Sequence, residues 1–271
     1  MVKLISWNIA GRVEPWRELL RSDADVALLQ EAAAPPPDVK ERLDLNDEPP
    51  WCSAGGRPWR TAVVALSDRV KIKALPLTPI GDALCGDLAV SRVGTLAAAE
   101  IYPLGSEPFT VISLYAVWEK PLTSTGSSWI YADASVHRLI SDLSVLIGKQ
   151  SGHRIIASGD LNILHGYGEN GSPYWKGRYV TVFDRMVALG LAFVGPQAPA
   201  GRQSSPWPAE LPAGSKNVPT YHTNQQTPST ATRQLDFVFA SEGFATRVRA
   251  VNDPAKWGPS DHSRLEICVT G

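Results

Sequence analysis

The sequence predicts an α/β fold in which two packed β-sheets are flanked by helices. Short apolar runs of four to eight residues recur from one end of the chain to the other, and most are continuously apolar rather than alternating. Such runs are typical of strands that are covered on both faces. They outnumber the helical patterns and do not alternate strictly with them, which argues against a doubly wound or barrel topology. We therefore expect a four-layer sandwich with two mainly antiparallel or mixed sheets.

The individual elements follow from the spacing of apolar residues. Strands are expected where Val, Ile and Leu are concentrated, over residues 2–6, 25–29, 61–66, 70–75, 109–116, 154–158, 235–240 and 264–269. Helices are expected where apolar residues recur every three or four positions, over residues 13–22, 132–148 and 179–189. Asp133 can cap the second helix and Gly148 can end it. Residues 76–94, 117–131 and 195–230 are expected to be long loops, which are usually either functional or disordered.

Length and composition favour one domain over residues 1–271. Hydrophobic residues make up 44% of the 271 residues, which is ample for a single core. No stretch approaches the ~20 apolar residues that a membrane helix needs. The first expected strand begins at Val2, which leaves no room for an export signal. We therefore expect a cytoplasmic monomer with no membrane contact and no obligate protein partner.

Charge and cysteine content restrict the function further. The 26 Lys and Arg residues nearly balance the 27 Asp and Glu residues, so the molecule lacks the strong positive field that draws a protein onto duplex DNA from every side. Any contact with nucleic acid must therefore be local. The three cysteines lack the spacing of a zinc site or a small disulfide scaffold, and we expect reduced packing residues at Cys52, Cys85 and Cys268.

Five short polar clusters lie where expected strands end or begin, the places at which loops assemble sites on a rigid frame. They are Trp7-Asn8, Gln30-Glu31, Gly159-Asp160-Leu161-Asn162, Gln234-Leu235-Asp236 and Ser260-Asp261-His262. Carboxylate and amide oxygens are the ligands that Mg²⁺ and Mn²⁺ prefer. Phosphodiester hydrolysis needs neutralised phosphate oxygens and an oriented water. Together the clusters indicate metal-dependent cleavage of a phosphate ester.

Most of these clusters also have an ordinary structural interpretation. Asp160 and Asn162 are two positions apart and point to the same side of an extended chain, but an Asx turn leaving the strand is equally consistent. The pair Asp261-His262 is equally consistent with a capped turn and a surface histidine. Asp236 is more informative, because an acid within an apolar run needs a partner. A histidine at a neighbouring strand end would supply that partner.

The five clusters, in this order and at these distances, resemble the endonuclease/exonuclease/phosphatase superfamily from residue 3 to residue 268. The resemblance implies a four-layer αββα sandwich and a divalent cation, Mg²⁺ or Mn²⁺. It implies that Glu31 is the principal metal ligand. It also implies that Asn8 and Asp261 lie close to the ion, directly or through water.

The same resemblance implies catalytic roles for five residues. Asp160 would orient or deprotonate the attacking water, and Asn162 would hold Asp160 and the phosphate in register. His262 would contact the phosphoryl oxygens as charge builds, with Asp236 as its paired carboxylate, and such a pair favours the protonated imidazole. Tyr115 ends an expected strand where the exonuclease III type has a tyrosine that contacts the phosphate and the DNase I and sphingomyelinase types have a histidine. This favours the exonuclease III type of site, although an aromatic residue that packs a loop at the strand end is the structural alternative.

Other polar residues are weaker candidates for contact with the substrate. Tyr221 and His222 lie where the superfamily often has an aromatic residue beside the scissile phosphate, although an ordinary loop pair is the alternative. His165 is a candidate to approach the site from the loop after Asn162. The basic residues grouped near the active end, which would grip phosphate or form solvated surface, are Arg233, Arg247, Arg249 and Lys216.

The chain also departs from the exonuclease III type. After Glu31 that type usually continues with Thr and then Lys, whereas here Ala32 to Ala34 run into three prolines. A dedicated abasic-site repair role is therefore in doubt. The leading hypothesis is a DNA endonuclease or exonuclease that uses in-line attack of an activated water. The alternatives are a phosphatase or phosphodiesterase acting on a small phosphoester, phosphoinositide or phospholipid head group, and a non-catalytic binding module, which the complete set of acids disfavours.

Overall fold

The computed structural model describes residues 1–43, 45, 50–121, 126, 130–148, 153–244 and 246–270, and its first large sheet is mixed. The strands of this sheet are β1 (Val2–Asn8), β2 (Val26–Ala32), β3 (Arg60–Ala65), β12 (Thr246–Ala250) and β13 (Leu265–Val269). They lie in the order β12-β13-β1-β2-β3. β1 is parallel to β2 and antiparallel to β13.

The second large sheet is also mixed. Its strands are β4 (Val70–Ala74), β7 (Leu96–Pro103), β8 (Phe109–Tyr115), β9 (Ile155–Asp160), β10 (Leu191–Gly195) and β11 (Asp236–Ser241). They lie in the order β10-β11-β9-β8-β7-β4, in which only β8 and β9 form a parallel pair. Two short strands, β5 (Thr78–Pro79) and β6 (Ala89–Val90), pair outside both sheets.

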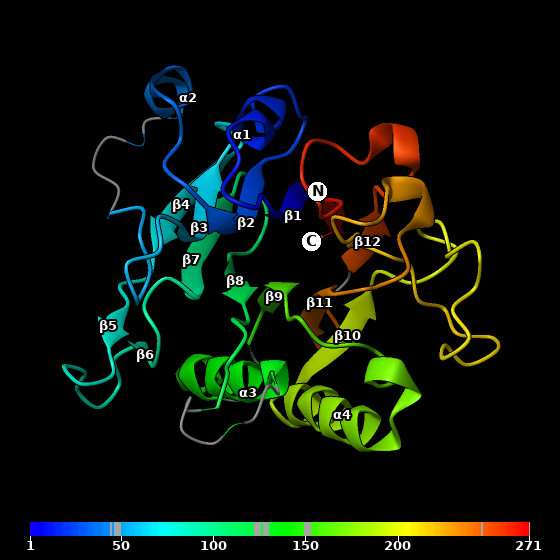
Figure 1. Cartoon of the computed structure of the whole chain (residues 1–271). Coiled ribbons are helices and arrows are strands. Elements are labelled where there is room, and N and C mark those ends of the chain that lie inside the picture. Colours follow the sequence, from blue (N-terminus) through cyan, green and yellow to red (C-terminus); the bar gives the residue numbers. More distant parts are fainter. Residues whose placement is uncertain are drawn as a thin grey trace.

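Helices lie on the outer side of each sheet (Figure 1). α1 (Glu14–Leu19) and α2 (Pro37–Arg42) lie beside the first sheet, and α3 (Ala132–Leu143) and α4 (Pro173–Ala188) lie beside the second. The layers therefore run helix, sheet, sheet, helix, which confirms the predicted αββα sandwich. No helix in the described part of the chain is both long and apolar enough to cross a membrane.

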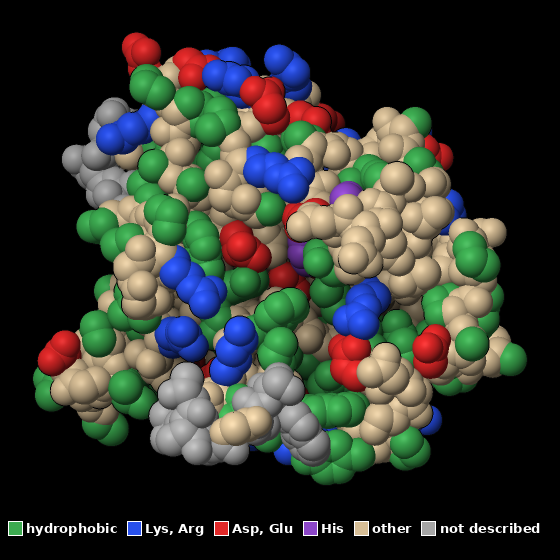
Figure 2. All heavy atoms as spheres, viewed as in Figure 1, with side chains coloured by type: hydrophobic (Ala, Val, Ile, Leu, Met, Phe, Trp, Pro, Cys, Tyr) green, Lys and Arg blue, Asp and Glu red, His purple; other side chains and the backbone are tan. Residues whose placement is uncertain are grey.

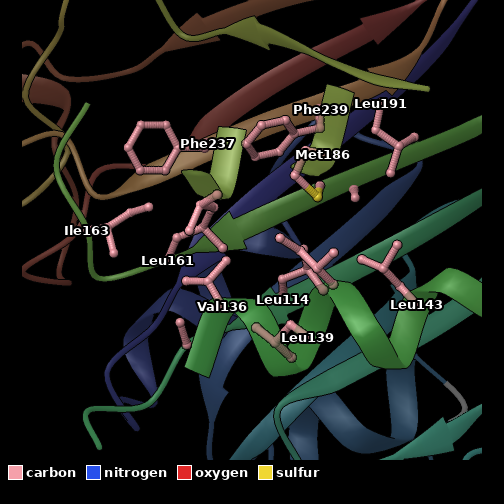
Figure 3. Packing of buried hydrophobic residues seen from close by; sticks show 14 of the residues in the cluster. Leu114, Val136, Leu139, Leu143, Leu161, Ile163, Met186, Leu191, Phe237 and Phe239 are labelled. Atoms are coloured by element: carbon pink, nitrogen blue, oxygen red, sulfur yellow. The ribbon is translucent and has the colours of Figure 1, made fainter. Parts of the chain in front are cut away.

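Three apolar layers hold these elements together. Val111 and Ile267 belong to the layer between the two sheets, and Trp16 packs α1 onto the outer face of the first sheet. Figure 3 shows the third layer, where Leu139 of α3 and Met186 of α4 point toward the second sheet. Each large apolar side chain buried in this way contributes about 1.5–3 kcal/mol. The sheets therefore form a rigid frame for the loops at their edges.

The helix boundaries differ from those predicted. α1 is shorter than residues 13–22, and α3 ends before a 3-10 turn at Ser144–Leu146, so Gly148 does not terminate it. Asp133 does not cap α3, because its carboxylate lies 2.6 Å from the guanidinium of Arg178 on α4. α4 begins earlier than residue 179, because the Ser172 side chain caps it by accepting the N–H of Trp175.

All eight predicted strands are present, but β7, β10 and β12 were not predicted. β7 contains three successive alanines, and β12 alternates exposed arginines with buried residues, so neither forms the Val-rich run that was sought. The predicted loop over residues 76–94 contains β5 and β6. Part of the predicted loop over residues 117–131, at 122–125 and 127–129, lies outside the described residues.

The cysteines are free, as predicted, but they are not all packing residues. Cys52 and Cys85 are exposed, and Cys268 is half-buried. The packing interpretation was therefore wrong for the first two, which lie in irregular segments before β3 and between β5 and β6. Small apolar character alone does not decide whether a loop residue is buried.

Candidate active site

The registers of the two sheets bring the predicted polar clusters to one edge of the sandwich. Asn8 is opposite Gln30 on the parallel strands β1 and β2, and Tyr115 is opposite Asp160 on the parallel strands β8 and β9. Asp236, the first residue of β11, is also opposite Asp160. Figure 2 shows a central hollow with acidic and histidine side chains at its floor. Strand ends from both sheets therefore build one site.

The Asn8 side chain links two carboxylates. Its Nδ2 donates to Oε1 of Glu31 at 2.9 Å and to Oδ2 of Asp160 at 3.0 Å. Its Oδ1 accepts the backbone N–H of Ala10 at 2.9 Å. Asn8 and Asp160 are buried, whereas Glu31 is half-buried. Asn8 thus turns its nitrogen toward the acids and holds them side by side, while its contact with a metal through oxygen stays a prediction.

The loop after β9 fixes the orientation of Asp160. The backbone N–H of Asn162 donates to Oδ1 of Asp160 at 2.9 Å, and Asn162 Nδ2 donates to Oδ2 of Asp160 at 3.2 Å and to the carbonyl of Ala116 at 2.9 Å. Asn162 has a φ of 52°, in the left-handed region that asparagine tolerates better than most residues. The Asx turn and the shared orientation, which were alternatives for the sequence, therefore occur together.

His262 lies between two buried carboxylates. Its Nδ1 is 2.9 Å from Oδ2 of Asp236, and its Nε2 is 3.7 Å from Oδ2 of Asp160. Burial disfavours the charged imidazole, but these two carboxylates outweigh burial and raise the pKa of His262 to about 10. Burial raises the pKa of Asp160, and His262 opposes that rise. The imidazole is therefore held as a cation, and the partner that buried Asp236 requires is His262.

Two buried hydrogen bonds tie β1 to the segment before β13. The indole Nε1 of Trp7 donates to the carbonyl of His262 at 2.9 Å. The Ser260 hydroxyl donates to the carbonyl of Asn8 at 2.7 Å. Each such bond contributes about 0.5–1.5 kcal/mol net. The positions of Asn8 and His262 are thereby fixed relative to each other through their backbones.

Tyr115 lies at the end of β8 beside Glu31. Burial raises the pKa of the phenol, and the carboxylates of Glu31 and Asp160 raise it further. The ring packs edge-on against Trp59, with the ring centroids 4.9 Å apart. Tyr115 therefore remains a neutral hydroxyl donor, and its ring is held in place by an aromatic neighbour that the sequence did not single out.

The site contains more negative than positive groups. Asp261 is half-buried and close enough to His262 to help raise its pKa. Asp160, Asp236 and His262 offer atoms within 4.8 Å of one another, but these atoms are largely engaged with each other. Glu31 and Asp261 are the more exposed carboxylates. A set of hard oxygen donors in excess of positive charge fits a divalent cation such as Mg²⁺ or Mn²⁺.

A pocket of about 470 Å³ opens beside Asn162 and Tyr221. The ring of Tyr221 lies 4.8 Å from the ring of His262, measured between centroids. Arg233 lines the same pocket and makes two contacts with the carboxylate of Glu169, at 2.9 and 3.2 Å. Tyr221 and Arg233 therefore lie next to the predicted catalytic residues. The other aromatic residues that line the pocket are Trp118, Trp175 and Tyr179.

Two histidines have neighbours outside the catalytic cluster. The ring of His222 packs against Trp257, with centroids 5.5 Å apart, so its contact with substrate stays a prediction. His165 packs 4.7 Å from the ring of Phe183, and its Nδ1 is 3.1 Å from Oδ1 of Asn217. The expectation that His165 approaches the site was wrong, because the chain turns into the aromatic core beneath α4.

The predicted basic grouping around Arg233 is not present as a unit. Arg247 and Arg249 are exposed on β12, and Arg249 pairs with Glu266 at 2.5 Å. Lys216 lies in a loop whose carbonyl at that position accepts the N–H of Ala198. These residues were grouped because they are near one another along the sequence, which did not reveal that β12 presents its arginines to solvent.

Thr220 is a supporting residue that the sequence analysis missed. Its buried hydroxyl accepts the N–H groups of Leu235 and Asp236 at 3.0 and 3.1 Å. Its carbonyl accepts the N–H of Ser263 at 2.8 Å. Thr220 therefore joins the segments that carry the aspartate and the histidine of the buried pair. A single threonine in a long loop gave no signal of this role.

Comparison with known proteins places the chain in a family. The model of the Endonuclease/Exonuclease/phosphatase family matches residues 5–262. No curated protein matches the chain. Among solved structures, the endonuclease domain of TRAS1, a telomere-specific non-LTR retrotransposon, has a TM-score of 0.61 at 15% identity, covering 100% of this chain and 99% of that one.

Two further structures show the same fold. The 3'-5' exonuclease (NExo) from Neisseria meningitidis has a TM-score of 0.58 at 17% identity, with 100% of both chains covered. The catalytic domain of Xenopus laevis APE2 has a TM-score of 0.61 at 16% identity, covering 99% of this chain and 91% of that one. The family match spans all five polar clusters that meet at the edge of the sheets. The chain therefore belongs to the endonuclease/exonuclease/phosphatase family and is a phosphoric ester hydrolase.

Proposed function

We propose that the protein is a divalent-metal-dependent nuclease that hydrolyses DNA by in-line attack of an activated water. One constellation carries this proposal: Asn8 holds Glu31 and Asp160 side by side, and the cationic ring of His262 lies against Asp160. Such a site can place positive charge on both sides of a phosphate. Two of the similar structures are an endonuclease domain and an exonuclease, which supports a nucleic acid as the substrate.

The carboxylates divide into two roles in this proposal. Glu31 and Asp261, which are half-buried, would hold Mg²⁺ or Mn²⁺, and the ion would neutralise charge on the phosphate oxygens. Asp160 accepts a proton from the attacking water. Its carboxylate is aimed by the two hydrogen bonds from Asn162, so the water is oriented before the reaction begins.

Two side-chain donors complete the contacts with the phosphate in this proposal. His262, which Asp236 keeps protonated, donates through Nε2 to a phosphoryl oxygen as negative charge builds there. The Tyr115 hydroxyl is beside Glu31 and donates to the same phosphate. Donors that are already in place cost no reorganisation at the moment of reaction.

A small phosphoester is the second candidate substrate. The aromatic pocket of about 470 Å³ beside Asn162 is within the range of about 300–1,000 Å³ that is typical of small-molecule sites. The net charge of −1 also does not require a polyanion as partner. Phosphoinositides and phospholipid head groups would belong to this class.

A side-by-side turnover screen distinguishes the two candidates. Abasic duplex, intact duplex, single-stranded DNA, RNA and a phosphoinositide are each incubated with the protein in Mg²⁺, in Mn²⁺ and in EDTA. We expect DNA cleavage with either cation, none in EDTA, and a loss of about 10²–10⁴-fold in the Asp160→Asn variant. DNA that remains intact at high protein concentration would contradict the nuclease proposal. Phosphate release from the phosphoinositide alone would favour the second candidate.

A further inference from the structure

Three basic side chains from different loops lie beside the active centre without an acidic partner. Arg57 and Lys120 are exposed and Arg92 is half-buried, and none of the three forms an ion pair within the described residues. We call them the basic platform. Arg92 and Lys120 line a hollow of about 490 Å³ together with Trp118. Figure 2 shows basic side chains gathered on one side of the central hollow.

Two of the three loops of the basic platform, those of Arg57 and Arg92, are tied to each other. The N–H of Ala54 donates to the carbonyl of Val93 at 3.0 Å, and the N–H of Thr61 donates to the carbonyl of Gly94 at 2.8 Å. Gly94 approaches Ser53 so closely that a Cβ on Gly94 would lie 2.4 Å from the Ser53 Cβ. The loop that carries Arg57 therefore keeps a fixed position relative to the loop before Gly94.

The acid nearest to the basic platform along the chain does not neutralise it. Glu119 precedes Lys120, but its two carboxylate oxygens accept from the guanidinium of Arg138 at 2.7 and 3.4 Å. Arg138 belongs to α3 and lines the same hollow as Glu119, so these two opposite charges neutralise each other there. The positive charge of the platform is therefore available to a ligand.

The basic platform is continuous with the active centre. Arg57 lies over the ring of Trp59 at 5.3 Å, and Trp59 packs on Tyr115, the neighbour of Glu31. Trp118 lines both the platform hollow and the aromatic pocket beside Asn162. Its side chain is 54% exposed, so an indole face is available where the two hollows meet.

We propose that the basic platform and Trp118 bind a nucleic-acid strand with unpaired bases next to the scissile phosphate. The backbone phosphates lie on the platform, and one base stacks on Trp118. Bases within a duplex stack on each other and offer no face to an indole, whereas an unpaired base does. The inference rests on the proposed nuclease function and specifies its substrate. The near-neutral net charge makes such a local positive surface necessary for binding a polyanion.

The first experiment measures how binding depends on salt. In an Asp160→Asn background, which keeps the strand uncut, the three platform residues are replaced together by Gln. The affinity for a labelled single-stranded DNA oligonucleotide is measured by fluorescence anisotropy over a series of salt concentrations. A plot of log affinity against log salt concentration has a negative slope. We expect this slope to become less steep by about 0.7 for each lost phosphate contact, which is a change of about 2 for the three residues.

The matched control removes the same charge elsewhere. It combines Lys40→Gln and Arg42→Gln on α2 with Lys71→Gln on β4, in the same background. The control should keep the parent's slope. An unchanged slope in the platform variant, or an equal fall in the control, would overturn the inference.

The second experiment tests the unpaired base. Trp118→Ala should weaken binding of the single strand by about 5-fold to 150-fold, which corresponds to about 1–3 kcal/mol per stacked base. Binding of a blunt duplex of the same sequence should change little. No loss, or an equal loss for both ligands, contradicts the stacking role. Cleavage of the same oligonucleotide by the unmodified protein is measured separately. If the protein cleaves DNA but the platform and Trp118 variants bind it as the parent does, this inference fails while the proposed nuclease function stands.

Discussion

One nitrogen atom of Asn8 positions two of the four carboxylates of the active centre. Asn8→Asp would replace the donating amide with an oxygen, so that both hydrogen bonds are lost and a third negative charge faces Glu31 and Asp160. Hydrogen bonds to charged groups contribute about 1.5–3 kcal/mol each. We expect kcat to fall by about tenfold to 150-fold for one such bond, and further for two. Asn224→Asp, an exposed change of the same chemistry, should leave kcat unchanged.

The buried pair of His262 and Asp236 predicts a specific pH dependence of stability. An unfolded histidine has a pKa of about 6.5, and the folded value is about 10. Because the folded state binds this proton more tightly, the contribution of His262 is fully present below about pH 6.5 and is lost as the pH rises through about 10. The slope is up to about 1.4 kcal/mol per pH unit.

Asp236→Asn tests this dependence, because it removes one of the three carboxylates that raise the pKa of His262. The variant should lose less unfolding free energy than the wild type over the alkaline range, measured by urea denaturation in EDTA. Tyrosine, lysine and cysteine titrations are common to both proteins and cancel in the comparison. Parallel curves for the two proteins would show that the pair does not hold its proton in the folded state.

At the scale of elements, the parallel pair β8 and β9 depends on a glycine. A Cβ on Gly159 would lie 1.8 Å from the carbonyl oxygen of Leu114, across the pair. Gly159→Ala must therefore push the strands apart, and we expect a loss of about 1–3 kcal/mol in unfolding free energy or more, together with loss of activity because Asp160 is the next residue. Gly177→Ala, on an exposed face of α4 with open space around it, should instead stabilise by about 0.5–1 kcal/mol. Denaturant unfolding of both variants checks the contrast.

A strand can be predicted from the sequence when it is buried along its whole length, because its residues are then apolar throughout. β9 and β11 are buried along their whole length, and their apolar runs were recognised. β7 and β12 were missed because tertiary contacts decide their conformation: alanines in β7 fit beside β8, and Arg247 and Arg249 alternate with buried residues at the edge of a sheet. The predicted range of helix α4 began too late, because the first turn of the helix depends on the Ser172 cap rather than on an apolar stripe.

Across the whole molecule, metal binding should be coupled to stability. A ligand that binds the folded state stabilises it by about 2.7 kcal/mol at a concentration one hundred times its Kd. We therefore expect Mg²⁺ or Mn²⁺ to raise the Tm of the wild type and EDTA to reverse the rise, measured by differential scanning fluorimetry. Glu31→Gln should weaken the response, and the exposed change Glu242→Gln should preserve it. An identical metal response in Glu31→Gln would remove Glu31 from the metal site.

The catalytic set was easier to predict than the surface around it. Asp160, Asp236 and His262 could be found because polar residues at strand ends and an acid inside an apolar run are unusual, and the structure brings them together. The basic platform, by contrast, consists of single residues from three loops. His165 was expected at the site because it follows Asn162 closely along the chain, but it packs against Phe183. Which loops meet depends on backbone contacts such as that of Gly94 with Ser53, which leave no local pattern.

The active centre is also a seam between the two sheets. Asn8, Glu31 and His262 come from strands or strand ends of the first sheet, whereas Asp160 and Asp236 come from the second, and their hydrogen bonds cross from one to the other. A slip of one sheet over the other by a fraction of a hydrogen-bond length would separate Asp160 from Asn8 and Asp236 from His262 at once. Turnover should therefore report on the docking of the two halves of the sandwich, and conservative changes in the apolar layer between them should slow the reaction before they unfold the protein.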